Sequence, residues 1–470
     1  MISFQEKLER RMATSTSRKV LVCGSGRVVS PCIKVLLKRQ CSVTIVSMIQ
    51  DELDVLSATY PGVQVLHIDV SKDTEQVHNL VAQHDLVVSL VPPPLHAAIA
   101  EHCIELKRCM VMASYVLENL KALNDKAVAA GVTILCEAGL DPGIDHMIAL
   151  RCIDSITERN GQITSYDSVC GGLPAPECSR VPLRYKFSWY PKGVLLSAIA
   201  NSVYLKNGKR VEVSAQDLDK IPDPSLKVPD QMIGDEELEV IPNRDSLKYV
   251  DLYGIQSASA VFRGTFRYKG YNDVIKAFSS LRLLETEEKS FLSAGSDPIT
   301  WKDLMARLLD LPQQSSYVQV REQLHERFGR NDLVTDTVVK LGLLDETLVP
   351  LLGAPVDVLT AQLLSCDSLS FGPEERDMVL MRTKIEAKFP DDYRESHNFE
   401  LVCYGQPNGH SAMSLTVGLT IGECSCLLLD GKVKRSGIIL PTTPDIYTPV
   451  LQLLEEEGIH VDSDIETCSL

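Results

Sequence analysis

The chain has 470 residues, of which 44% are hydrophobic and 23% charged, and its formal net charge at pH 7 is -16. This length is too great for one hydrophobic core and predicts two or three domains. The negative charge argues against nucleic acid and anionic membranes as partners, and no apolar run is expected to span a membrane. The 14 cysteines are scattered without a C-x-x-C pair, which indicates a reducing compartment, no disulfide framework and no metal.

Residues 1–17 are polar and mixed in charge, and we expect them to be a linker or a disordered segment. Arg10 and Arg11 are typical of a transit peptide, but Glu6 and Glu9 are not.

A strand, a tight turn and a helix follow. An apolar run over 20–23 stops at the glycine turn 24–26, and apolar residues then recur with helical spacing over 28–37. The first glycine permits a sharp turn, and the second lets backbone N–H groups and a helix N-terminus approach a pyrophosphate. Val29 replaces the usual third glycine, so the turn alone leaves a plain strand-to-helix connection as an equal alternative.

Five more buried strands are expected, separated by helical patterns such as 95–106 and 116–130. Strands that alternate with helices imply a parallel sheet covered on both faces, with ligands beyond the carboxyl ends of the strands. The expected strands are 42–46, 63–68, 86–91, 110–112 and 133–136.

The end of the second strand normally selects the nicotinamide dinucleotide. An acid there binds the adenosine ribose of NAD, and an arginine favours the 2′-phosphate of NADP. Ser47 and Met48 are neither, while Asp51 and Glu52 follow too late to be placed. The absence of a base favours NAD, with NADP as the alternative.

From about residue 162 the pattern changes to runs that predict a mixed or antiparallel sheet, followed by a helical region and a return to α/β structure. The expected strands are 165–171, 186–189, 209–213, 258–268 and 399–404, and the expected helical stretches are 273–364 and 411–429.

Six segments, taken in order, resemble the glutamate-forming saccharopine dehydrogenases, including those that form one half of a bifunctional animal enzyme. The resemblance runs from about residue 18 almost to the C-terminus. The segments are E-A-G-L-D-P-G-I-D-H at 137–146, V-C-G-G-L-P-A-P-E at 169–177, L-R-Y-K-F-S-W at 183–189, P-N-R-D-S at 242–246, R-G-T-F-R-Y-K-G-Y at 263–271 and F-G-P-E-E-R-D-M at 371–378.

The resemblance implies an α/β fold with a Rossmann-type parallel-sheet domain, a mixed-sheet α/β substrate domain and a small helical domain. The expected boundaries are 18–141, joined by about 410–470, for the dinucleotide-binding domain, 142–277 with 365–409 for the substrate domain, and 278–364 for the helical domain.

The resemblance also implies an oxidoreductase of lysine degradation. Such an enzyme oxidises saccharopine with NAD or NADP and water to L-glutamate and α-aminoadipate semialdehyde. Two alternatives stay open: a superfamily relative that makes or cleaves another secondary amine, as carboxynorspermidine or homospermidine synthases do, and a catalytically weak dinucleotide-binding sensor.

The catalytic residues implied by the resemblance are Asp141, Tyr115 and Cys170. Asp141 would orient the substrate amine and move its proton, whereas Cys170 has an equal alternative as a small residue beside Gly171 and Gly172. The expected substrate-binding residues are Ser25, Ser114, Tyr115, Asp141, Arg244, Thr265, Phe266 and Arg267. The expected cofactor-binding residues are Gly24, Ser25, Gly26, Val28, Val29, Ser47, Asp51, Asp69, Val70, Ser89, Leu90, Val91, Pro92, Ala113 and Leu140.

Arg244 and Arg267 are expected to clamp substrate carboxylates, because a guanidinium grips a carboxylate bidentately. We expect the glycine turn and Asp141 to border one crevice that these two arginines close. Other residues are expected to have ordinary roles: Arg184 and Arg263 as solvated cations, Asp145 and His146 as structural groups, Phe187 and Trp189 as core aromatics, and His96, His102 and His410 as histidines without functional partners.

The resemblance implies a mitochondrial matrix location, with the cytoplasm as the alternative, and no metal. It further implies fusion to or association with a lysine-ketoglutarate reductase domain, and a homodimer.

Overall fold

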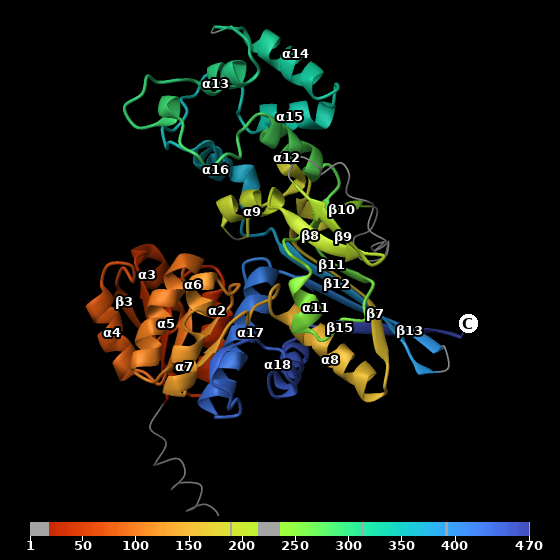
Figure 1. Ribbon diagram of the computed structural model, residues 1–470. Helices are drawn as coiled ribbons and strands as arrows, with labels where there is room; N and C mark the ends of the chain where they lie inside the picture. Colours follow the sequence, from red (N-terminus) through yellow and green to blue (C-terminus); the bar gives the residue numbers. More distant parts are fainter. Residues whose placement is uncertain (1–17, 189, 215–235, 313, 391–392, 470) are drawn as a thin grey trace, which may run out of the picture. The chain divides into compact units, whose positions relative to one another are not determined.

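The computed structural model describes residues 18–188, 190–214, 236–312, 314–390 and 393–469 (Figure 1). The chain divides into two compact units. The first comprises Met1–Arg151 with Ser414–Ile459, and the second Cys152–Met413 with His460–Leu470. The predicted linker at 1–17 and Trp189 lie outside the described residues.

The first unit contains a seven-stranded sheet in the order β14-β6-β5-β4-β1-β2-β3, and every neighbouring pair is parallel. The chain builds outward from β1 to β3 and then returns to the other side of β1 with β4. Ligands of such sheets bind beyond the carboxyl ends of the strands at this switch point. The strands are β1 (Lys19–Cys23), β2 (Ser42–Ser47), β3 (Gln64–His67), β4 (Leu86–Ser89), β5 (Cys109–Met112), β6 (Thr133–Leu135) and β14 (Gly437–Ile439).

Helices connect these strands or, as α8 does, lead into the second unit, as expected from the sequence. They are α2 (Val29–Lys38), α3 (Gln50–Thr59), α4 (Thr74–Gln83), η1 (Pro93–Leu95), α5 (His96–Glu105), α6 (Glu118–Lys121), α7 (Asn124–Ala130), α8 (Ile144–Glu158), α17 (Ala412–Leu429) and α18 (Pro444–Glu456). The single helix predicted over 116–130 is wrong, because the chain forms α6 and α7 instead. A bond of 2.9 Å from the Leu123 N–H to the Leu120 carbonyl tightens the chain between them, and both leucines reach the core.

Helix α17 corrects a second expectation, since by length and composition it could cross a membrane. Within the described residues, however, 83% of its apolar window is buried inside the protein, which core helices also show. Two glycines let α2 approach α17 closely. A β-carbon on Gly418 would lie 2.5 Å from the Val28 carbonyl oxygen, and one on Gly422 would lie 2.8 Å from the Val35 β-carbon.

The second unit contains the mixed sheet that the sequence predicts. Its order is β15-β13-β12-β7-β11-β8-β9, with β10 paired to β11; the pair β7–β11 is parallel and the other pairs are antiparallel. The strands are β7 (Gln162–Pro174), β8 (Ser202–Lys206), β9 (Lys209–Val213), β10 (Leu238–Pro242), β11 (Ala260–Tyr268), β12 (Asp377–Lys388), β13 (Tyr393–Tyr404) and β15 (Val461–Ser469).

The strand predicted at 186–189 is wrong for its described residues, 186–188, which form a loop. Lys186 Nζ lies 2.9 Å from the Ser370 carbonyl oxygen and 2.8 Å from the Glu375 carboxylate. The Phe187 N–H donates to the Leu369 carbonyl. These contacts hold the segment against another loop instead of a strand.

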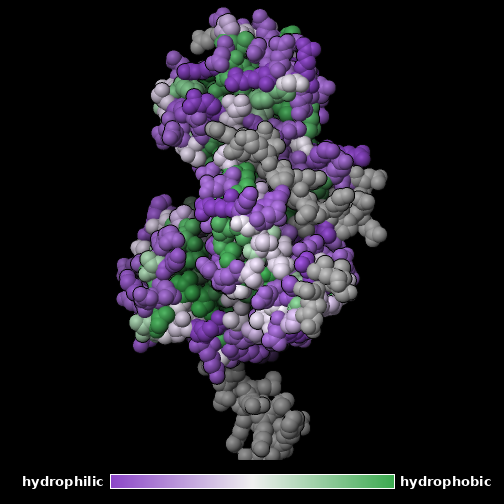
Figure 2. Space-filling view, turned by 45° about the vertical axis from the view of Figure 1, so that its right-hand side comes forward, coloured by the Kyte–Doolittle hydropathy of each residue, from purple (hydrophilic) through white to green (hydrophobic). Residues whose placement is uncertain are grey.

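The helical region predicted at 273–364 is confirmed. Fully buried Trp301 belongs to its core, while polar residues cover most of the face shown at the top of Figure 2. Its elements are α12 (Tyr271–Ser280), η5 (Ser290–Leu292), α13 (Trp301–Leu308), α14 (Tyr317–Arg327), α15 (Asp332–Lys340) and α16 (Pro355–Ser365). The remaining short elements of this unit are η2 (Pro176–Cys178), η3 (Pro182–Arg184), α9 (Pro191–Ala198), α11 (Lys248–Leu252) and η6 (Asp367–Leu369).

Candidate active site

The glycine turn follows β1 at the switch point of the parallel sheet. Gly24 has φ +111°, and a β-carbon there would lie 2.8 Å from the Leu90 carbonyl oxygen, so only glycine fits. A β-carbon on Gly26 would meet nothing within 4 Å, which leaves its backbone open to a ligand. Val29 is buried and begins α2, where a third glycine is usual. The turn therefore fits the pyrophosphate of a dinucleotide.

Three polar side chains meet beside this turn. The hydroxyls of Ser25 and Ser47 lie 2.7 Å apart, and Ser25 also donates to the carboxylate of Glu52 in the first turn of α3. Because Ser25 carries a single proton, Ser47 must donate between the two hydroxyls. Glu52 thus brings a negative charge to the end of β2, where the sequence analysis found no acid. Asp51, which was predicted instead, is exposed.

Asp69, just after β3, is held by its own loop. Its carboxylate accepts the Ser71 hydroxyl at 2.6 Å and the Ser71 N–H at 3.0 Å, and Lys72 lies 3.0 Å away. These contacts, with the Ser71 hydroxyl first, lower the pKa of Asp69 to about 2. The group is therefore an anion near neutral pH.

His96 links the ends of β4 and β5. Its Nδ1 lies 2.8 Å from the Ser89 Oγ, and its Nε2 lies 3.1 Å from the Ser114 Oγ. Burial lowers the pKa of His96 to about 4, so the ring is neutral near pH 7. The expectation that His96 lacks partners is wrong, because it joins a predicted cofactor residue to a predicted substrate residue.

Two of the predicted catalytic residues meet in the first unit. The Tyr115 hydroxyl, one residue after Ser114, donates to the Asp141 carboxylate at 2.8 Å. Both side chains are half-buried. A phenol on a carboxylate, beyond the carboxyl ends of β5 and β6, is a pair that can orient an amine and exchange protons with it.

A second pair in this unit is buried and consists of the carboxylate of Glu137 and the ring of His146. The Oε2 of Glu137 is 2.8 Å from the Nε2 of His146, and its Oε1 accepts the Val116 N–H at 3.2 Å. Glu137 and His146 are 4% and 0% exposed. His146 thus contacts Glu137, and the pair supports the chain next to Tyr115.

The loop that carries Asp141 is closed by its own backbone. The Gly139 N–H donates to the Pro142 carbonyl at 3.1 Å, and the Ile144 N–H donates to the Gly139 carbonyl at 3.0 Å. Gly143 has φ +147°, and a β-carbon there would lie 2.1 Å from the Gly139 oxygen. The glycines of the E-A-G-L-D-P-G segment therefore permit the tight loop that presents Asp141.

In the second unit, Cys170 on β7 pairs with Thr265 on β11. Cys170 is 5% exposed. Its neighbour Gly171 packs tightly, since a β-carbon there would lie 2.8 Å from the Phe266 β-carbon. The predicted residues of these two strands are therefore adjacent.

The four arginines of this unit that the sequence analysis singled out differ in surroundings. Arg267 is 4% exposed, its guanidinium carbon lies 5.0 Å and 5.2 Å from the ring centres of Tyr185 and Tyr271, and Nη1 donates to the Phe266 carbonyl at 2.7 Å. Within the described residues it forms no ion pair, and its Nε has no hydrogen-bond partner. A buried guanidinium without a carboxylate is costly and suits an anionic ligand.

Arg263, expected to be solvated, is instead 3% exposed. It donates to the Tyr249 hydroxyl and lies over that ring at 4.3 Å. Arg244, expected to clamp substrate, is exposed. Arg184, also expected to be solvated, pairs with Glu236 and is partly buried.

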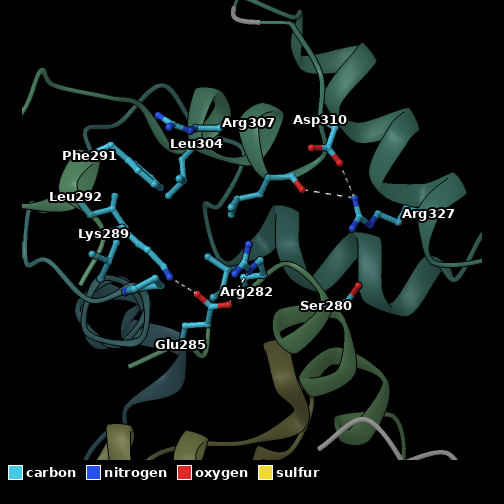
Figure 3. A pocket seen from close by; sticks show the side chains of 14 residues that line it. Ser280, Arg282, Glu285, Lys289, Phe291, Leu292, Leu304, Arg307, Asp310 and Arg327 are labelled. Atoms are coloured by element: carbon cyan, nitrogen blue, oxygen red, sulfur yellow. Dashed lines mark hydrogen bonds and ion pairs between the residues drawn. The ribbon is translucent and has the colours of Figure 1, made fainter. Parts of the chain in front are cut away.

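Two other features lie apart from these residues. A cavity of about 370 Å³ in the helical segment contains none of the predicted site residues. In Figure 3, Glu285 pairs with Lys289 at 2.6 Å, and Arg327 lies between Asp310 and a main-chain carbonyl. His102, expected to lack partners, lies 3.2 Å from His78.

The predicted residues come together in four groups, each within one unit. These are Ser25 with Ser47, Ser89 with Ser114 through His96, Tyr115 with Asp141, and Cys170 with Thr265. Sequence reasoning missed Glu52 and His96 as members, gave Glu137 no role, and took His146 as a structural group without its partner. The signals for Glu137 were its place directly after the predicted strand 133–136 and in the segment 137–146, and His146 had only its place in that segment.

The parallel sheet, its open glycine turn and the Tyr115–Asp141 pair define a dinucleotide-dependent oxidoreductase. Two family models match the chain: the saccharopine dehydrogenase NADP binding domain over residues 20–135 and the saccharopine dehydrogenase C-terminal domain over residues 139–459. The chain belongs to the saccharopine dehydrogenase family.

Individual relatives agree with this assignment. The chain is 38% identical to the mitochondrial alpha-aminoadipic semialdehyde synthase of Rattus norvegicus over 449 residues, which cover 95% of this chain and 48% of the relative. It is 32% identical to the saccharopine dehydrogenase [NADP(+), L-glutamate-forming] of Saccharomyces cerevisiae, covering 94% of this chain and 98% of that protein. The chain thus spans about half the length of the animal relatives it matches.

A solved structure agrees in fold. The apo histidine-tagged saccharopine dehydrogenase (L-Glu forming) from Saccharomyces cerevisiae superposes with a TM-score of 0.84 at 32% identity. The match covers 96% of this chain and 100% of that chain.

Proposed function

We propose that this chain oxidises saccharopine with a nicotinamide dinucleotide and water, giving L-glutamate and α-aminoadipate semialdehyde in lysine degradation. The observation that carries the proposal is the 2.8 Å hydrogen bond from Tyr115 to Asp141. It lies beyond the carboxyl ends of parallel strands, where dinucleotides bind in this fold. The names of the fungal relatives support the substrate and products.

The chemistry assigned to this pair is proton transfer. A nicotinamide dinucleotide held at the turn of Gly24 and Gly26 would supply the oxidation, as acceptor of the hydride from the substrate carbon beside the secondary amine. Asp141 takes the amine proton, and Tyr115 holds the carboxylate that receives it. Water then adds to the carbon of the resulting imine, the C–N bond breaks, and the nitrogen departs with glutamate.

The surroundings of Arg267 support the proposal that the substrate carries several carboxylates. It is a buried cation with aromatic faces and no described anionic partner. We propose that it binds one carboxylate of saccharopine, together with Thr265. Exposed Arg244 is a second clamp in this proposal, and Cys170 lines the site as a small residue.

The choice between NAD and NADP as cofactor has evidence for each. The description of the family model and the names of the fungal relatives favour NADP. The Glu52 carboxylate at the end of β2 opposes a 2′-phosphate by like-charge repulsion and can accept ribose hydroxyls. We propose that Glu52 decides the choice and that NAD is preferred.

Location and assembly follow the animal relatives in this proposal. Their names place them in mitochondria, and we propose the matrix for this chain. We further propose association with a lysine-ketoglutarate reductase domain, and a homodimer.

The test is an assay of the purified chain with saccharopine and either NAD or NADP. Formation of reduced dinucleotide should require saccharopine, and glutamate should appear in equal amount. Carboxynorspermidine and homospermidine serve as matched secondary amines. Turnover of either one in place of saccharopine, or of none, would overturn the proposal.

A further inference from the structure

We propose that His96 is a positioning residue which fixes the Ser114 hydroxyl as a hydrogen-bond donor toward a carboxylate of the substrate. In this arrangement Ser89 donates to Nδ1 of His96, and Nε2–H of His96 donates to Ser114. The inference rests on the proposed function for the identity of the carboxylate, but the direction of the hydrogen bonds follows from this unit alone.

Ser89, His96 and Ser114 differ in burial. Ser89 and His96 are 0% and 2% exposed, so water and ligands do not reach their polar atoms. Ser114 is only partly buried and can meet a ligand. The three groups therefore form a chain from the core to the surface, with one accessible end.

The proton of the Ser89 hydroxyl has one acceptor within reach among the described side chains. Within the described residues, the Ser89 hydroxyl has one side-chain partner, the His96 Nδ1 at 2.8 Å. If Nδ1 carried the ring proton, the Ser89 O–H would be buried without an acceptor, which costs free energy. Ser89 must therefore be the donor and Nδ1 the acceptor.

The tautomer of the His96 ring follows from this direction. Burial holds His96 neutral near pH 7, and a neutral imidazole carries one N–H. With Nδ1 as acceptor, that N–H is on Nε2, which lies 3.1 Å from Ser114. Ser114 then accepts from the ring, and its own proton stays available for an acceptor outside the chain.

This polarity suits the proposed substrate. Saccharopine carries carboxylates, which only accept hydrogen bonds, and Ser114 precedes Tyr115 of the proton-transferring pair. The opposite polarity would turn lone pairs of Ser114 toward those carboxylates. If His96 had only a structural role in the core, its tautomer would not affect the affinity for substrate.

The tautomer is measured first, on the full chain without cofactor or substrate. Nitrogen-15 NMR of labelled histidine, with the His96 signals assigned by their loss in His96→Gln, should show Nε2 protonated and Nδ1 unprotonated. This state should persist from about pH 6 to about pH 8, a range that spans the ordinary pKa of histidine. Ser89→Ala should remove the donor to Nδ1 and mix the tautomers. A ring protonated on Nδ1, or on both nitrogens, would overturn the inference.

Two matched variants test the consequence. Glutamine places its amide near the position of Nε2 and can donate to Ser114, whereas asparagine reaches only the position of Nδ1. We expect His96→Gln to keep the KM for saccharopine within about threefold, and His96→Asn to raise it about tenfold or more, the loss typical of a hydrogen bond to a charged group. Dinucleotide affinity, measured by calorimetry, should stay within about threefold in both variants.

Thermal unfolding of both variants separates positioning from stability. Equal KM values in two folded variants would overturn the inference, as would a KM that follows the melting temperature alone. A wild-type chain that is inactive on saccharopine would overturn the proposed function, while the tautomer measurement would still decide the direction of the hydrogen bonds.

Discussion

Glu137 and His146 form a buried pair, with Oε2 and Nε2 2.8 Å apart. The other carboxylate oxygen of Glu137 accepts the Val116 N–H, next to Tyr115. The segment after β5 is thus fixed at three successive residues: Ser114 by His96, Tyr115 by Asp141, and Val116 by Glu137. The buried pair therefore supports the residue that we place in proton transfer.

Removal of His146 should destabilise the first unit. His146→Ala removes the hydrogen bond to Oε2 of the buried Glu137, and the loss of a hydrogen bond at a buried polar group typically costs about 1–3 kcal/mol. The free energy of unfolding in urea measures this loss. His78→Gln is the control, because this half-buried histidine should change stability by less than about 0.5 kcal/mol. Equal losses in the two variants would contradict the assigned role.

Tyr115→Phe should change the pH dependence of activity more than stability. The variant keeps the ring but removes the hydroxyl that donates to Asp141. A carboxylate with one donor fewer holds its proton at higher pH. The acidic limb of the kcat/KM profile should therefore move to higher pH, with kcat lowered about 10- to 100-fold. An unchanged acidic limb would remove Tyr115 from the proton-transferring pair.

Much of this architecture can be predicted from the sequence, because each strand of a parallel sheet is a short apolar run that ends in turn residues. The helix expected over 116–130 failed because only the fold shows that Leu120 and Leu123 must both reach the core. The segment 186–188 resembles a strand locally, but its partners are loop residues far along the chain.

The site residues likewise divide into those whose place can be predicted from the sequence and those whose place depends on the fold. Tyr115 and Asp141 lie at strand ends, so the order of the elements is enough to predict their neighbourhood. Glu52 lies five residues after Ser47, in the first turn of α3, and only the path of this helix turns it toward Ser25. The partners of His96 depend on tertiary contacts that no local pattern contains.

Arg267→Lys should raise the KM for saccharopine while leaving dinucleotide affinity nearly unchanged. Lysine keeps the charge but loses the planar fork and the contacts with Tyr185 and Tyr271. We expect a rise of about 10- to 100-fold, the loss of a hydrogen bond to a charged group. Arg263→Lys, on the same strand and equally buried, is the matched control and should affect stability instead. A larger KM effect at Arg263 would contradict the placement of the clamp.

Glu52→Gln should shift cofactor preference toward NADP. The variant keeps an acceptor for the Ser25 hydroxyl but removes the negative charge beside the predicted ribose position. Loss of one like-charge repulsion at a partly exposed site is worth about 1 kcal/mol, or about fivefold in affinity. Calorimetric titration of NAD and NADP with both proteins measures the ratio. Asp51→Asn is the control, and an equal shift there would show that general surface charge, and not Glu52, sets the preference.

Glu395 should make the second unit sensitive to acid. Its carboxylate accepts hydrogen bonds from both terminal nitrogens of Arg159, at 2.7 Å and 2.6 Å, and also lies 2.7 Å from the His397 Nε2. These contacts, with Arg159 first, lower the pKa of Glu395 to about 2. Because the folded pKa lies below the ordinary value of about 4.3, the pair stabilises the fold above that pH and loses its effect as the pH falls toward 2.

Arg159→Gln tests this dependence. At pH 7 the variant should be less stable by about 1–2 kcal/mol, a figure reduced for screening because the Arg159 side chain is 46% exposed. The difference in unfolding free energy between wild type and variant should shrink steadily from about pH 4.3 to about pH 2, since both proteins then carry a protonated Glu395. Arg330→Gln removes an exposed pair, 3.7 Å from Glu326, and should change stability by less than about 0.5 kcal/mol at any pH. A difference for Arg159→Gln that stays constant as the pH falls would mean that packing of the arginine stem, and not its charge, provides the stabilisation.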